Sequence, residues 1–250
     1  MLGFPLEATT FLILFCRVGA VLMLLPVFSE EAVPVRIRLL LALGMSAALW
    51  GIVSPKVGPA VASDAALPGL IIAETLVGLA MGMIVRIMFH AAAMAGSIVS
   101  IQIGLSAAML FDPGQGGHAA ALGKFVSVAA ALVCMGIGVH HLWIASIVQS
   151  YGLFPVGGLP PGEDFARLAV EVTGQSMALA LSLAAPLLVY GIVFNVALGL
   201  TARMAPAIQV FFIAQPLNIM LGIALFAIVL GTMLSTFAQA MAEWMQTTWA

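Results

Sequence analysis

The hydrophobic residues of this chain fall into long runs, and most of its few charged residues lie at the joins between them. The runs cover about 8–28, 36–53, 66–89, 91–149, 168–199 and 207–241. A helix needs roughly 20 apolar residues to cross a bilayer core, and none of the runs alternates as barrel strands do. The pattern therefore predicts an all-α fold: a polytopic helical membrane protein of about six long apolar helices or hairpins, with no soluble domain.

The run 91–149 is too long for one helix, and proline and clustered glycines interrupt it at 112–117. Non-helical backbone at membrane depth is tolerated only where it is buried in protein or lines a water-filled cavity. Bulky apolar residues at 107–111 lead directly into this interruption, which makes the segment a candidate plug. An ordinary turn between two helices is the alternative. Turn-forming residues predict further loops at 54–59 and 155–162.

Composition strengthens the membrane prediction, because 63% of the residues are hydrophobic and only 7% are charged. A soluble domain is roughly 25% charged. The net charge of −2 gives no sign of nucleic-acid binding.

Two charged residues, Arg17 and Glu74, lie inside apolar runs rather than at their ends. A bare charge is costly there, so such groups normally pair or line a wet cavity. We expect both side chains to face protein, either each other or a partner subunit. A proton relay is the alternative, but it would need a chain of several carboxylates, which the sequence lacks.

The remaining polar clusters do not form a catalytic or metal-binding pattern. Glu30 and Glu31 near Arg36 have the wrong spacing for an intramembrane protease, and Pro34 would break the helix that such a motif needs. Adjacent histidines such as His140 and His141 point to different faces of a helix. We therefore predict no catalytic residue, no metal, no cofactor and no enzymatic activity. A small secondary transporter stays open as an alternative function.

The order of several short motifs resembles the FliR family of flagellar export-gate proteins over nearly the whole chain. The N-terminal motifs are Arg17-Val-Gly, Pro26-Val-Phe and Pro34-Val-Arg36, and then Glu74 with Val77-Gly78 and Gly82. Gly104-Leu-Ser through Phe111-Asp112-Pro113 follows. The C-terminal motif comprises Arg203, Ala205, Pro206, Gln209, Val210, Phe211, Pro216, Leu217 and Gly222. Asn218 departs from the family, which often has lysine there.

The resemblance implies one integral-membrane domain, 1–250, that is a structural subunit of the flagellar type III export gate. FliR-like proteins assemble with FliP and FliQ, with FlhB attached and FlhA below, in the bacterial inner membrane as part of the basal body. Unfolded flagellar proteins would pass through the pore, and membrane lipids would surround it. The injectisome paralogue shares much of the pattern and stays open as an alternative.

The resemblance also implies roles for particular residues. The loop at about 106–118 would act as a plug, with Met109, Leu110, Phe111, Asp112, Pro113 and Gly114 as its central residues. The residues expected to serve assembly or to be buried polar groups are Arg17, Glu74, Arg86, Arg203, Pro206, Gln209, Phe211 and Pro216.

Overall fold

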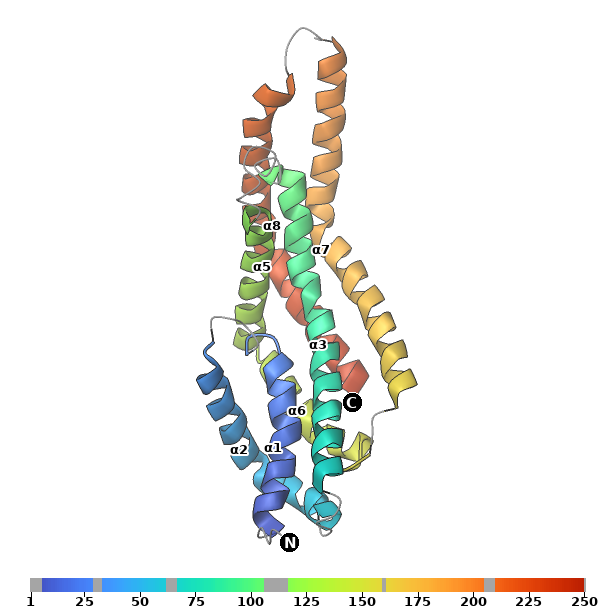
Figure 1. Cartoon of the computed structure of the whole chain (residues 1–250). Coiled ribbons are helices and arrows are strands. Elements are labelled where there is room, and N and C mark those ends of the chain that lie inside the picture. Colours follow the sequence, from blue (N-terminus) through green and yellow to red (C-terminus); the bar gives the residue numbers. More distant parts are fainter. Residues whose placement is uncertain are drawn as a thin grey trace. The chain divides into compact units, whose positions relative to one another are not determined.

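The computed structural model describes residues 6–28, 33–61, 67–105, 117–158, 161–204 and 210–249, and these ranges contain helices joined by short turns, with no strand (Figure 1). The helices are α1 (Leu6–Leu24), α2 (Val35–Val61), α3 (Leu67–Ile103), α5 (Gly117–Gly136), α6 (Val139–Leu153), α7 (Gly162–Met204) and α8 (Val210–Trp249). Five are long and apolar enough to cross a membrane, and α5 with α6, bent by 77°, form a sixth candidate span. The prediction of an all-α polytopic membrane protein is confirmed.

The prediction that one segment ends near 89 and the next begins at 91 was wrong. α3 runs unbroken from Leu67 to Ile103. Polar residues near this point, Arg86 and His90, do not stop a helix by themselves, and neither glycine nor proline occurs between 86 and 95. The break that the sequence analysis missed lies between α5 and α6, where Gly138 has a left-handed φ of 84°.

The predicted loop at 54–59 is also absent, because α2 continues through Pro55 and Pro59 to Val61. Val53, Val57 and Val61 follow one another at intervals of four residues and are almost completely buried. Burial of this face keeps α2 helical through the two prolines. The packing free energy therefore outweighs the cost of the backbone hydrogen bonds that the prolines cannot donate. The turn predicted after residue 154 is present, with Gly157 at φ 82°.

The helices are divided between two compact units. The first unit comprises Met1–Met88, Gly138–Thr173 and Ala242–Ala250, and the second comprises Phe89–Ile137 and Gly174–Met241. α3, α7 and α8 each contribute residues to both units.

Glycines set the close helix contacts of the first unit, in which α2 also packs against α1 and α6. A Cβ atom on Gly78 of α3 would lie 2.6 Å from the carbonyl oxygen of Arg17 in α1. A Cβ atom on Gly82, one turn later, would lie 2.7 Å from Cβ of Leu24. Small residues four apart therefore allow α3 to approach α1 closely, as is common between membrane helices.

Glycines also allow close helix contacts in the second unit. A Cβ atom on Gly96 of α3 would lie 2.8 Å from Cα of Gly123 in α5, so two glycines face each other where these helices cross. Phe89 and Phe237 pack edge to face, with ring centroids 5.3 Å apart. Phe237 is 1% exposed and anchors α8 in this unit.

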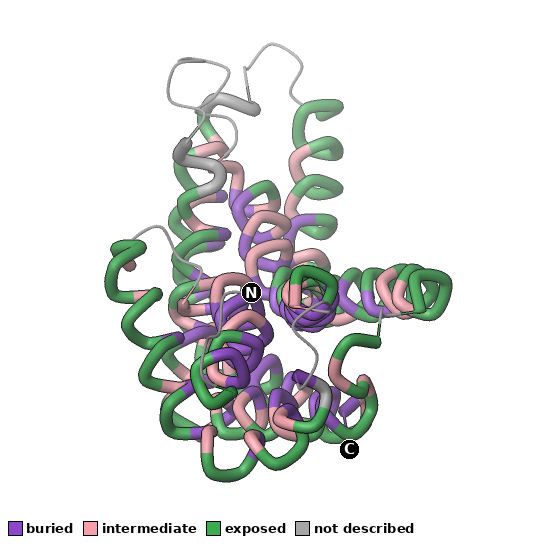
Figure 2. Tube along the Cα trace, turned by 60° about the horizontal axis from the view of Figure 1, so that its bottom comes forward, coloured by how far each residue is buried: buried purple, intermediate pink, exposed green. Residues whose placement is uncertain are grey.

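Large apolar side chains remain exposed along α2, α7 and α8. Figure 2 colours all exposed positions of the described residues, polar and apolar alike, green. They include Val35, Leu40, Ile52, Val189, Ile192, Val196, Ile213, Met220 and Ile228. In a water-soluble monomer, so much exposed apolar surface would cause aggregation. These faces are suited to contact lipid or the apolar helices of other subunits.

Candidate functional site

A completely buried ion pair joins α1 to α3 in the first unit. The Nε atom of Arg17 donates to Oε2 of Glu74 at 2.6 Å, and its Nη2 atom donates to Oε1 at 2.8 Å. Both side chains are 0% exposed. The two parallel bonds form a bidentate pair, which is the strongest geometry for a guanidinium and a carboxylate.

The same pair holds the end of α6. Arg17 donates from Nη1 to Oγ of Ser150 at 3.2 Å and from Nη2 to the carbonyl oxygen of Phe154 at 3.0 Å. Its guanidinium carbon lies 4.0 Å from the ring centroid of Tyr151, within cation–π range. The backbone N–H of Gly157 donates to Oε1 of Glu74 at 3.2 Å. The ion pair therefore connects three helices and the turn that follows α6.

Two glycines permit this geometry. Gly78 lies one helical turn after Glu74, and its missing side chain lets α3 approach the backbone of α1 at Arg17. Gly157 has a φ of 82°, a conformation that strongly favours glycine, and this turn presents its N–H to the carboxylate. A Cβ atom on Gly157 would also lie only 2.6 Å from Cδ2 of Leu70.

This arrangement is suited to holding helices together rather than to chemistry. Both carboxylate oxygens of Glu74 accept hydrogen bonds, and the guanidinium is surrounded by acceptors and an aromatic ring. Over the described ranges, no three His, Cys, Asp or Glu side chains lie close enough to bind a metal ion. His140 and His141 stack at the start of α6, with ring centroids 4.1 Å apart.

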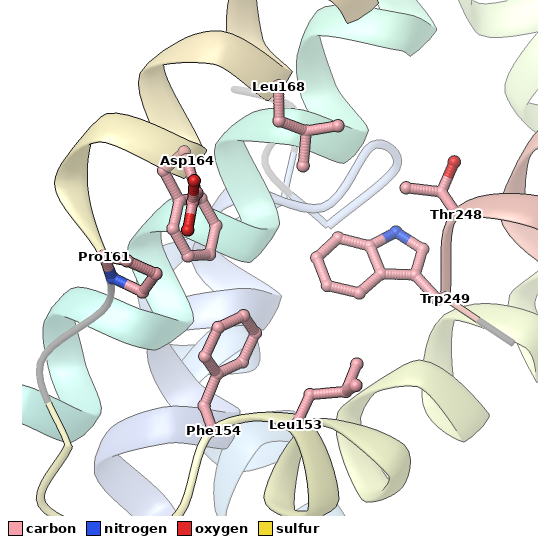
Figure 3. Close-up of a pocket in the computed structure, with 8 residues that line it drawn as sticks. Leu153, Phe154, Pro161, Asp164, Leu168, Thr248 and Trp249 are labelled. Carbon is pink, nitrogen blue, oxygen red and sulfur yellow. The ribbon is translucent and has the colours of Figure 1, made fainter.

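A pocket of about 270 Å³ lies beside this cluster, between the end of α6, the start of α7 and the end of α8 (Figure 3). Its lining is mostly apolar, with Asp164 and Thr248 as polar exceptions: Leu153, Phe154, Pro161, Asp164, Phe165, Leu168, Thr248 and Trp249. The rings of Phe154 and Phe165 lie 5.4 Å apart. Phe154 thus lines the pocket with its ring while its carbonyl oxygen accepts a bond from Arg17.

A second polar cluster lies in the second unit, where α8 meets the end of α3. Gln215 donates from Nε2 to the carbonyl oxygen of Gly104 at 3.1 Å, and Asn218 donates from Nδ2 to that of Gln102 at 3.4 Å. The hydroxyl of Tyr190 in α7 donates to Oδ1 of Asn218 at 2.8 Å. The sequence analysis assigned no role to Gln215 or Tyr190 and noted Asn218 only as a departure from the family.

The structure brings Arg17 and Glu74 together, but it does not join the described residues Arg86, Arg203 and Pro216 to them. Arg86 in α3, Arg203 near the end of α7 and Pro216 in α8 are exposed. Phe211 lies in the first turn of α8. Residues 109–114, Pro206 and Gln209 lie outside the described residues.

Sequence reasoning missed the residues that complete the ion-pair cluster, namely Ser150, Tyr151, Phe154 and Gly157. A partial signal exists, because Ser150 and Phe154 are four residues apart and can lie on one side of a helix end. Their partner is 133 or more residues away in the sequence, so no local pattern identifies it.

Comparison with known proteins places the chain in a family. The model of bacterial export proteins, family 1, matches residues 8–244. A flagellar biosynthetic protein FliR from Caulobacter vibrioides is 41% identical over 86% of this chain and 86% of its own length. FliR proteins of Escherichia coli and Bacillus subtilis are 35% and 29% identical over 84% of this chain, and 80% and 81% of their own lengths. The chain therefore belongs to family 1 of the bacterial export proteins, as a multi-pass membrane component of the flagellar export apparatus.

Proposed function

We propose that the chain is a structural subunit of the flagellar type III export gate and forms the core of a pore for unfolded flagellar proteins. The match over residues 8–244 to proteins named for flagellar biosynthesis carries this proposal. The three relatives described above are named as flagellar proteins, which favours the flagellum over the injectisome. The bacterial inner membrane, within the flagellar basal body, is the proposed location.

The exposed apolar faces of α2, α7 and α8 support a role among other membrane helices. The proposed partners are FliP and FliQ within the gate, with FlhB and FlhA as further contacts. The buried Arg17–Glu74 pair supports a structural subunit, because the two groups bond to each other and to Phe154 and Gly157 inside the chain. The driving force for export would then come from other components.

Purification from the native membrane tests the assembly. The chain carries an affinity tag, is extracted in mild detergent, and its partners are identified by mass. We expect FliP and FliQ to co-purify, whereas a tagged multi-pass transporter from the same membrane should not recover them. Recovery of the chain alone or as a homo-oligomer would favour the transporter alternative.

We propose further that the segment at about 106–118, centred on Met109–Gly114, plugs the pore. The support comes from the sequence, where bulky apolar residues lead into a Pro- and Gly-rich stretch. Apolar constrictions can close a pore by dewetting. α3 ends just before this segment and α5 begins at Gly117, so both flanks are anchored in helices of the second unit.

Shortening 112–117 tests the plug. The assembled gate should then leak small ions across the membrane, measured as loss of a potassium gradient in cells or in reconstituted vesicles. Gln115→Ala, which keeps the segment's length, is the matched control and should not leak ions. Unchanged permeability in an assembled, shortened variant would contradict the plug role.

A further inference from the structure

The pocket between α6, α7 and α8 is larger than a site for a single bound water. It holds about 270 Å³ and is lined only by residues of the first unit. A water molecule takes up about 30 Å³, and a buried water needs about two to four polar partners, which a mostly apolar lining does not provide. Pockets for small molecules begin at about 300 Å³. The pocket is therefore suited to one apolar segment of an amphiphilic ligand.

Two neighbouring residues of α8 bring hydrogen-bond donors to one wall of this pocket. Trp249 is 5% exposed, and its buried Nε1 atom has no hydrogen-bond partner among the described residues. Figure 3 shows this nitrogen on the ring edge nearer Thr248 and Leu168, which also line the pocket. Buried tryptophans usually pair this N–H group, and an unpaired buried donor is unfavourable. A carbonyl oxygen that enters the pocket would supply the missing acceptor, with the hydroxyl of Thr248 as a second donor.

Neither an unpaired indole nor an apolar pocket is sufficient on its own. Trp143 is 1% exposed and its Nε1 atom also lacks a partner among the described residues, but Trp143 does not line the pocket. A larger pocket of about 560 Å³ lies between α1, α2 and α3, and Thr9 is the polar exception in its lining. The hydroxyl of Thr9 already donates to the carbonyl oxygen of Leu6 at 2.9 Å. Of these two pockets, the one beside Trp249 therefore has a donor that still needs an acceptor.

Acidic residues at the start of α7 give the pocket a negative edge. Asp164 lines the pocket and is exposed in the first turn of α7. Glu163 beside it is paired with Arg167 at 3.5 Å, so these three residues keep one negative charge in excess. A cationic group of a ligand is favoured next to Asp164, and an anionic group is repelled. The edge therefore favours an amine headgroup over an anionic one.

Two candidate membrane spans end at this pocket, because α7 begins at Gly162 and α8 ends at Trp249. Tryptophan is enriched at membrane–water interfaces, where its ring meets acyl chains and its N–H meets polar groups. From these features we infer that the pocket binds a phospholipid with an amine headgroup, phosphatidylethanolamine. Such binding depends on the chain's place in a membrane and not on a pore.

Each part of this lipid has a matching group in the pocket. The first carbons of one acyl chain contact the apolar side chains of Phe154 and Leu168. The ester carbonyl oxygen accepts a hydrogen bond from Nε1 of Trp249, and the ammonium group pairs with Asp164. Phe154 also connects the lipid site to the buried ion pair, because its carbonyl oxygen accepts a bond from Nη2 of Arg17 at 3.0 Å.

Photoactivatable lipids test this site in the complex purified from the native membrane in dodecyl maltoside micelles, which carry no charge. One probe is phosphatidylethanolamine and the other is phosphatidylglycerol, each with a diazirine near the ester end of one acyl chain. After photolysis and digestion, mass spectrometry quantifies the label in peptides that contain 153–168 or 244–249. Peptides of the larger pocket, which contain 8–15 or 67–71, measure labelling by acyl-chain contact alone.

The phosphatidylethanolamine probe should label the peptides at 153–168 and 244–249 about two- to fivefold more than the phosphatidylglycerol probe, the range that an exposed ion pair gives. Asp164→Asn should remove this difference. Trp249→Phe with Thr248→Val should lower labelling by phosphatidylethanolamine about two- to tenfold, because the donors to the ester are lost. Trp143→Phe is the matched control, since it removes an equally buried, unpaired indole outside the pocket, and should change nothing.

Three results would overturn the lipid site. The first is equal labelling by both probes that Asp164→Asn leaves unchanged. The second is labelling at 153–168 and 244–249 that the double variant does not lower. The third is label in the isolated chain but none in the complex, which would show that a partner subunit covers the pocket. If the double variant does not assemble, unlabelled lipids compete with the probe in the wild-type complex; stronger competition by phosphatidylethanolamine than by phosphatidylglycerol supports the site, and equal competition overturns it.

Discussion

Removing one partner of the Arg17–Glu74 pair should destabilise the protein far more than removing an exposed ion pair. In Arg17→Leu, the Glu74 carboxylate stays buried and, among the described residues, keeps the N–H of Gly157 as its one remaining donor. Breaking a buried pair in this way lowers the free energy of unfolding by about 3–5 kcal/mol. Glu74→Leu should cost a similar amount, because Arg17 then retains only neutral partners.

The double variant Arg17→Leu/Glu74→Leu should cost less than the sum of the two single changes, by about 2–3 kcal/mol. It leaves no buried charge, so its remaining cost comes from neutral groups that lose partners, at about 1–3 kcal/mol each. These groups are the carbonyl oxygen of Phe154 and the N–H of Gly157.

Equilibrium unfolding in mixed micelles with increasing sodium dodecyl sulfate measures these free energies. Arg167→Leu is the control, because its pair with Glu163 at 3.5 Å is 77% and 88% exposed. That change should cost at most about 0.5 kcal/mol. The reasoning would be refuted if either single change lowered the free energy of unfolding by less than about 1 kcal/mol. It would also be refuted if the effects of the two single changes added within about 0.5 kcal/mol in the double variant.

Two further predictions concern the packing of each unit. Gly78→Ala should lower the unfolding free energy by about 1–3 kcal/mol, because the new methyl group meets the backbone of α1 at 2.6 Å. Gly69→Ala, at a position of α3 with nothing within 4 Å, should be neutral or slightly stabilising; equal losses at both sites would contradict close packing at Gly78. Phe237→Ala should cost about 3–5 kcal/mol, measured in the same micelle assay, because the ring is 1% exposed. Phe125→Ala, at a ring that is 51% exposed, should cost much less, and a similar cost would show that burial is not the cause.

The helical class and the two buried charges could be predicted because they depend on local properties of the sequence. An apolar run long enough for a membrane span, and a lone charge within it, are visible without knowing the fold. The identity of Arg17's other partners could not be predicted. Ser150 and Phe154 reach it only after α6 has packed against α1 and α3, which is a tertiary event.

The errors in the helix boundaries have the same origin. Pro55 and Pro59 indicate a loop by local rules, but the buried valines on the same helix hold it together. His90 looked like the end of a segment, yet one polar side chain does not interrupt backbone hydrogen bonding. At the end of α3, the carbonyl groups of Gln102 and Gly104 accept hydrogen bonds from Asn218 and Gln215, which are more than 100 residues away.

The ion pair also has a consequence for the order of events during synthesis. Glu74 follows Arg17 by 57 residues, so at roughly 5–20 residues per second it is made about 3–11 s later. During that interval α1 carries an uncompensated arginine, which costs about 2.5–3.5 kcal/mol at the centre of a membrane-inserted helix. Insertion of α1 is therefore more favourable once α3 supplies Glu74 to neutralise Arg17.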